Sequence, residues 1–346
     1  KLRPLLSYFR QNDPFRIFGL IVLLFLTRLF FFLAVGTEAT FDQIKLNGIE
    51  TYFNEGAGPL FQLLSAGLSF ILSNAYLNAS FAALIILWNA TLLNALLIRN
   101  SAFEDNSFIP SALYVILISF NSDNFFLTSQ LLGTSFLLIA FLFLHQHLRF
   151  RNSDEKILSI GSTLALASLF HIPYIWLLVL ILILFLFYSG TVGRRYLLLF
   201  WGLAMVLLLA WLPFLYLEKG SDFWGLFYKG LSTFQFNSTW LINIGIALAL
   251  PLLISLKTSA SNLAGMGMTN LQITVKRVFT WIGLFGILHV LFLSGNSASS
   301  TNLLIVSLSY FLTEHLLNTK KKWMAELTFS LVILLILVML YVGPLY

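Results

Sequence analysis

The chain has 346 residues, of which 59% are hydrophobic and only 10% are charged, and it contains no cysteine. Soluble domains carry roughly 25% charged residues, so this composition excludes an ordinary soluble fold. The missing cysteine excludes disulfides, thiolate metal sites and a thiol nucleophile. The net charge of +6 comes from small basic clusters that flank apolar runs, a placement that favours membrane orientation over nucleic-acid binding.

Apolar runs of about 17–25 residues, long enough to cross a bilayer, recur along most of the chain. They predict an all-α fold, a polytopic transmembrane helical bundle of about 11–12 spans that forms a single domain over 1–346. No small-residue cleavage site follows the first run, so we expect a retained span and not a signal peptide. The spans lie near 16–36, 58–75, 80–98, 108–121, 126–146, 157–170, 173–189, 196–216, 239–256, 278–294, 301–317 and 324–343.

The first span carries Arg28 inside an apolar run and leads into a loop with Glu38 and Asp42. A charge inside lipid costs roughly 2.5–3.5 kcal/mol on insertion scales, so Arg28 is expected at an interface or facing a polar interior. The basic N-terminus predicts that residues 37–57 lie outside the cytoplasm. Two interpretations stay open: Glu38 or Asp42 is a general base beside a phosphate-binding Arg28, or the loop follows topology and Arg28 snorkels.

The number of crossings between 58 and 146 is not settled by the charge pattern. Four candidate spans lie there, yet a cytoplasmic Arg149 requires an odd number of crossings. Either 58–75 enters the membrane without crossing it, or 108–146 crosses once with an interfacial piece.

Two short polar stretches follow in chain order. Asp123, between two apolar spans, is a candidate site residue or only a turn residue. His171 precedes Pro173 at the tip of a predicted helical hairpin, where it is either an acid, base or ligand, or a polar residue satisfied by its neighbours. His145 and His147, at the predicted cytoplasmic end of a span, are expected to be solvated.

Residues 217–238 are rich in aromatics and contain Trp224 and Lys229. They predict an amphipathic helix in the interface, either shaping a groove for a lipid-linked substrate or serving only as an anchor. A second interfacial helix is expected in the first outer loop. In the C-terminal half the basic clusters place the C-terminus outside, and Glu314 marks a cytoplasmic span edge where either ion pairing or snorkelling suffices.

Four stretches together resemble the GT-C superfamily of integral-membrane glycosyltransferases. The first span ends in Thr27-Arg28-Leu29 before a carboxylate-bearing loop, and a proline-led helix opens at Gly58-Pro59. The run 118–144 resembles the short outer turn of that family, and 160–173 its glycine- and alanine-containing helix that ends at a proline tip. The similarity covers roughly residues 1–240, which would be the GT-C-like core, with 241–346 as C-terminal helices.

The resemblance implies transfer of a sugar from a polyprenyl-phosphate donor at the outer face of the bacterial inner membrane. Asp42 or Glu38 would be catalytic, and the substrate would be bound by Arg28, His171, Lys229, Trp224 and Asp123. No protein metal site or cofactor is expected, although a divalent cation is compatible with this chemistry. The family often carries adjacent Asp-Glu where this chain has Glu38 and Asp42 apart.

Other functions are compatible with the same sequence. The chain also resembles an uncharacterised family of Bacteroidota inner-membrane proteins, which implies a location but no activity. A non-enzymatic membrane subunit or scaffold of an envelope-assembly or protein-export complex, bound to partner subunits, is the main alternative. A transporter is a third, but no internal repeat supports it.

Overall fold

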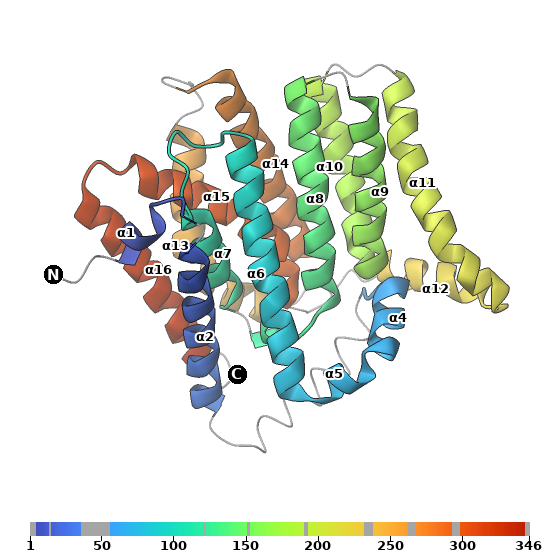
Figure 1. The fold of residues 1–346 in the computed structure, drawn as a ribbon, viewed down its shortest axis with the longest axis horizontal. Helices are drawn as coiled ribbons and strands as arrows, with labels where there is room; N and C mark the ends of the chain where they lie inside the picture. The colour runs from blue at the N-terminus through green and yellow to red at the C-terminus, as the bar shows by residue number, and fades with distance from the viewer. Residues whose placement is uncertain are drawn as a thin grey trace.

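The computed structural model describes residues 5–13, 15–35, 56–120, 122–150, 153–189, 193–231, 238–261, 268–292 and 298–342. Over these ranges the chain is a bundle of helices without strands, and its one β-bridge joins Ala57 to His171. Figure 1 shows long, roughly parallel helices, with shorter helices α4, α5 and α12 at one end. The predicted all-α class is therefore confirmed.

Six segments among the described residues are long and apolar enough to cross a membrane. They are α6 (Ala75–Arg99), α8 (Ser129–Phe150), the continuous run of η2 (Ile172–Trp176), α10 (Leu177–Leu184) and η3 (Phe185–Ser189), then α11 (Gly193–Tyr216), α14 (Asn270–Phe292) and α16 (Lys322–Val342). The remaining elements are α1 (Leu5–Phe9), α2 (Arg16–Val35), α4 (Pro59–Gly67), α5 (Ser69–Ser73), α7 (Ile109–Ile118), η1 (Ser122–Phe125), α9 (Asp154–Phe170), α12 (Gly220–Leu231), α13 (Ser238–Ser261), η4 (Ala298–Thr301) and α15 (Asn302–Asn318).

The exposure of the long helices identifies lipid as their solvent. In α11 only 11% of the most apolar 18-residue window is buried, and Leu197, Leu209 and Trp201 are each more than half exposed. A helix this apolar and this exposed needs an apolar surrounding, which water does not provide. The protein is therefore a multi-pass membrane protein.

Residues 58–75 do not form one spanning helix. They divide into α4 and α5, of 9 and 5 residues, with Leu68 between them and Asn74 capping the next helix. Neither piece reaches the roughly 20 residues that a span requires. This geometry matches the alternative in which 58–75 enters without crossing, whereas the total of about 11–12 spans stays a prediction.

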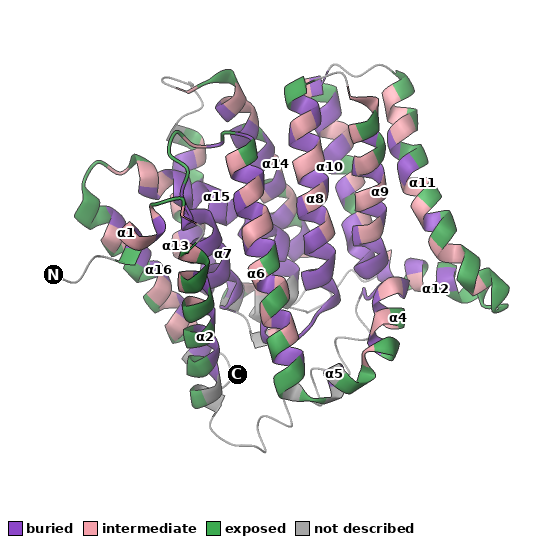
Figure 2. Ribbon diagram, viewed as in Figure 1, coloured by how far each residue is buried: buried purple, intermediate pink, exposed green. Residues whose placement is uncertain are grey.

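The core of the bundle is built on two helices with almost no lipid contact. All ten residues of α7 are buried, and so are the first thirteen of α15. Figure 2 shows both helices purple along most of their length, in contrast to α2 and α11. Because lipid solvates apolar side chains as well as protein does, such burial arises from packing and polar contacts between helices.

The helix ends divide the bundle into two ends of different chemistry. At one end, the last turn of α8 and the first turns of α9 and α11 carry the basic residues Arg149, Lys156, Arg194 and Arg195. At the other lie α4, α5, α12 and the turn from α9 to η2 (Figure 1), which we call the α12 end.

Candidate functional site

Arg28 lies in the second half of α2 and is buried, with 8% of its surface exposed. Its Nη1 donates hydrogen bonds to the carbonyl oxygens of Ala79 at 2.7 Å and Phe125 at 2.9 Å, and its Cζ lies 5.2 Å from the centre of the Phe125 ring. No carboxylate pairs with Arg28 within the described ranges, where its buried Nη2 also lacks a hydrogen-bond partner. The charge is thus held by peptide dipoles on one side only.

The turn that holds Arg28 is itself fixed by side chains. The Asn78 Oδ1 accepts a hydrogen bond from the Leu127 N–H at 2.8 Å, and the Asn124 Nδ2 donates to the Ile118 carbonyl at 3.1 Å. Asp123 is half-buried in η1, and its carbonyl oxygen accepts from the Phe126 N–H. Both the turn and the site interpretation of Asp123 remain compatible with this position.

His171 is buried where α9 gives way to η2. Its Nδ1 lies 3.3 Å from the Ser129 Oγ at the start of α8, only four residues after the Phe125 carbonyl that binds Arg28. Its Nε2 is buried and lacks a hydrogen-bond partner among the described residues. One turn, residues 125–129, therefore contacts two of the side chains predicted for the site.

A second histidine, not predicted from the sequence, completes a buried polar cluster. The His289 ring on α14 lies 5.9 Å from that of His171 and 5.5 Å from that of Tyr174, and its Nδ1 is 3.2 Å from the Ser300 carbonyl. The Tyr174 hydroxyl lies 2.9 Å from the Thr134 Oγ1. A histidine inside an apolar span is a signal in itself, and it could have identified His289.

The predicted amphipathic helix is confirmed as α12. Phe223 and Phe227 are buried, whereas Trp224 is 48% and Tyr228 is 77% exposed. Lys229 is exposed on the same helix. The buried face packs on η2, next to His171, so Trp224 and Lys229 belong to the same end of the bundle as the buried cluster.

Glu38 and Asp42 lie outside the described residues. The chain that carries them leaves the end of α2 and returns at Gly56. There the Gly56 carbonyl accepts a hydrogen bond from the Ile172 N–H at 2.9 Å, and the Gly58 N–H donates to the Phe170 carbonyl at 2.8 Å. The returning chain is thus attached directly beside His171.

The basic end contains polar contacts that the sequence showed only in part. Glu314 forms an ion pair as expected, and its partner is Lys276, with the Nζ 2.7 Å from the Oε1 and both side chains buried. The expectation that His145 and His147 are solvated is wrong, because both are buried. His147 Nε2 lies 2.8 Å from the Ser189 Oγ, a contact between residues 42 positions apart that no local pattern predicts.

No group of three or more His, Cys, Asp or Glu side chains suited to a metal ion occurs among the described residues. The α12 end carries several hydrogen-bond donors. They are Arg28 with its unpartnered Nη2, the imidazoles of His171 and His289, and the exposed side chains of Lys229 and Trp224. Such donors bind phosphate oxygens.

Residues 59–345 match a family described as a family of unknown function, DUF6427. No curated protein matches the chain, and no solved structure matches it.

Proposed function

We propose that this chain, which belongs to the DUF6427 family of unknown function, is a membrane-embedded transferase that takes a sugar from a polyprenyl-phosphate donor at its α12 end. The observation that carries the proposal is Arg28. It is a buried cation, without a carboxylate partner in the described ranges and with Nη2 uncommitted, at the end of the bundle to which the acidic loop is attached. A phosphate oxygen is the acceptor that such a nitrogen lacks.

In the proposed reaction, Asp42 or Glu38 removes the proton from the hydroxyl of the acceptor. The acceptor oxygen then bonds to the anomeric carbon of the sugar, and the bond from that carbon to the phosphate oxygen breaks. The leaving polyprenyl phosphate keeps the electron pair, and Arg28 and Lys229 stabilise its charge. Trp224 lies on the exposed face of α12, where it would contact the lipid part of the donor.

His171 and Asp123 would position the substrate. Both lie next to the 125–129 turn that also holds Arg28, so a shift of that turn would move all three groups together. A divalent cation could join the phosphate, but the proposal assigns it no protein ligand.

The charges at the two ends of the bundle imply an orientation in the membrane. The basic end would face the cytoplasm and the α12 end the outer side of a bacterial inner membrane, because arginine and lysine are retained on the cytoplasmic side. The N-terminus would be cytoplasmic and the C-terminus periplasmic.

One observation favours a second function, that of a non-enzymatic subunit which scaffolds an envelope-assembly or export complex. Arg28 already donates to two backbone carbonyls, as expected of an arginine that only joins α2, α6 and η1. In that case its charge would stabilise the bundle and not a substrate.

The test uses the purified full chain in proteoliposomes with a radiolabelled polyprenyl-phosphate sugar and membrane-derived acceptors. The double variant E38Q/D42N should lose transfer, whereas E104Q/D105N, which alters two exposed acids between α6 and α7, should keep it. Equal transfer by both variants would refute the proposed base. Absence of transfer in the wild type, with a partner protein that copurifies equally with both variants, would favour the scaffold.

A further inference from the structure

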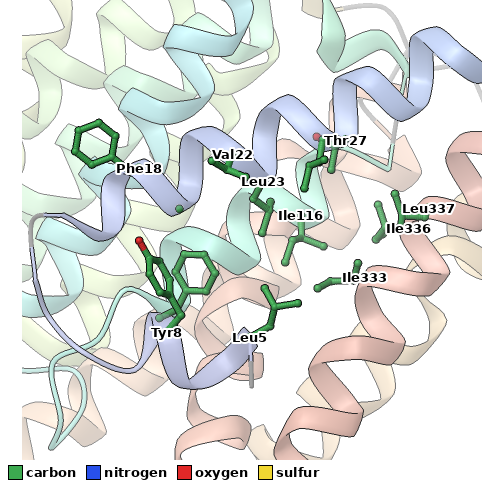
Figure 3. A pocket seen from close by; sticks show the side chains of 13 residues that line it. Leu5, Tyr8, Phe18, Val22, Leu23, Thr27, Ile116, Ile333, Ile336 and Leu337 are labelled. Atoms are coloured by element: carbon green, nitrogen blue, oxygen red, sulfur yellow. The ribbon is translucent and has the colours of Figure 1, made fainter. Parts of the chain in front are cut away.

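An apolar groove of about 450 Å³ runs between α1, α2, α7 and α16, on the lipid-facing side of the bundle. Figure 3 shows the side chains of these helices turned toward it. Several of the α1 and α2 side chains along it are more than half exposed, so the groove opens sideways. The lining includes Leu5, Tyr8, Val22, Leu26, Ile116 and Ile333.

The groove has the length of one membrane leaflet. Along α2 its lining extends from Phe18 to Thr27, which at 1.5 Å per residue is about 14 Å. The hydrocarbon core of a bilayer is about 30 Å thick, so one leaflet is about 15 Å deep. The groove therefore matches a single acyl chain that enters from one leaflet.

Positive charge lies at one mouth of the groove. The Arg16 guanidinium lies 4.2 Å over the ring of Tyr8, which lines the groove, and Arg10 follows Phe9 of the lining. The Nε atoms of both arginines are buried and lack hydrogen-bond partners in the described part of the chain. Residues 1–16 contain four basic residues and one acidic residue, Asp13.

The nearby carboxylates are already engaged. The Glu326 carboxylate on α16 accepts hydrogen bonds from the Leu6 and Ser7 N–H groups at 3.2 Å each, and so caps the first turn of α1. The Asp13 Oδ1 accepts from the Phe15 N–H at 3.1 Å. Neither carboxylate forms an ion pair with Arg10 or Arg16 among the described residues. The Arg10 Nη2 donates to the Leu316 carbonyl at 3.3 Å, and the Arg16 Nη2 donates to the Gln11 amide oxygen. Both of these acceptors are neutral, so neither arginine has an acidic partner among the described residues.

We propose that this groove binds one acyl chain of an anionic glycerophospholipid, whose phosphate is held by Arg10 and Arg16. The basic mouth lies at the start of α2, whereas the groove extends along α2 to Thr27, the residue before Arg28. The proposed lipid binding does not depend on the proposed transferase activity. A lipid of this class matches both observations, since the apolar groove takes its tail and the basic mouth takes its headgroup.

The binding is measured by native mass spectrometry of the purified full chain, titrated with phosphatidylglycerol or with phosphatidylcholine of the same acyl chains. The wild type should bind phosphatidylglycerol more tightly. R10Q/R16Q should weaken that binding about 30-fold, since each basic residue near the surface contributes about 1 kcal/mol and 1.4 kcal/mol is tenfold. The same variant should weaken phosphatidylcholine binding less than phosphatidylglycerol binding, because the choline cation of that zwitterionic lipid offsets the charge of its phosphate.

V22W fills the groove from a lipid-facing position that is 57% exposed, so the packing between helices is preserved. This variant should weaken the binding of both phospholipids at least tenfold. Its matched control is V179W, at a lipid-facing valine of α10 that is 42% exposed. For the charges the control is R99Q/R149Q, at exposed arginines away from the groove. Both controls should bind like the wild type.

Three outcomes would overturn the proposal. The first is equal lipid binding by V22W and V179W, which would place the lipid elsewhere. The second is equal wild-type affinity for the two phospholipids, which would remove the role of the arginines. The third is displacement of phosphatidylglycerol by an equimolar polyprenyl monophosphate in the wild type, which would assign the groove to that lipid.

Discussion

The buried ion pair between Lys276 and Glu314 gives the sharpest stability prediction. The Nζ lies 2.7 Å from the Oε1, and the two side chains are 7% and 2% exposed. The same Nζ donates to the Thr258 carbonyl at 2.9 Å, so the pair joins α13, α14 and α15. Replacing the lysine by methionine leaves a carboxylate buried without its cation.

Loss of one partner of a buried pair costs about 3–5 kcal/mol. At roughly 2 °C per kcal/mol for a chain of more than 150 residues, K276M should lower the unfolding midpoint by about 6–10 °C. K276M/E314L removes both charges and should recover most of that loss, because well-packed apolar residues replace buried pairs without net cost.

The assay is the unfolding midpoint of the purified protein in detergent, followed by intrinsic tryptophan fluorescence. The control is D154N, which breaks the pairs of Asp154 with the exposed Arg194 and the half-buried Arg195 near the protein surface. Surface pairs contribute about 0.2–1 kcal/mol each, so the loss of both pairs in D154N should shift the midpoint by no more than about 4 °C. A K276M shift as small as that of D154N, or a double variant less stable than K276M, would refute the reasoning.

Two further predictions use the same assay. R28M should lower the free energy of unfolding by about 2–4 kcal/mol, because the Ala79 and Phe125 carbonyls lose a charged donor. R28K should lower it less, since an ammonium can still donate a hydrogen bond. An R28M midpoint equal to that of the wild type would contradict this reasoning. G58A should destabilise by about 1–3 kcal/mol, because the added Cβ would lie 2.0 Å from the Leu169 carbonyl oxygen, whereas G67A meets nothing within 4 Å and should be neutral or slightly stabilising. Equal unfolding midpoints for the two glycine variants would contradict this, because they would show that the backbone around Gly58 shifts away from Leu169 at no cost in stability.

The long spans were predictable because their signal is local. The runs near 126–146 and 196–216 coincide with α8 and α11 within about four residues, and those near 80–98 and 278–294 lie over α6 and α14, which begin earlier, at Ala75 and Asn270. The interruption of 58–75 was less visible. Leu68 ends α4, and no proline or charged residue marks that position. The one indication was that a cytoplasmic Arg149 requires an odd number of crossings between 58 and 146, where four candidate spans lie.

The polar contacts were not predictable to the same degree, because each joins residues far apart in the chain. The sequence marked His171 but gave no reason to pair it with His289, and it marked Glu314 without indicating Lys276. Solvation of His145 and His147 was inferred from a nearby arginine. That inference failed because α8 continues to Phe150, which leaves both histidines inside the bundle.

Helix α15 has a consequence for how the protein is made. It leaves the ribosome after α7, α8, α13 and α14, yet it packs against all four of them and fills the centre of the bundle. These four helices must therefore insert into the membrane before α15, their common packing partner, has been made. Truncation before Asn302 would remove a packing surface shared by α7, α8, α13 and α14, so the packing of these four helices is completed only after α15 has been made.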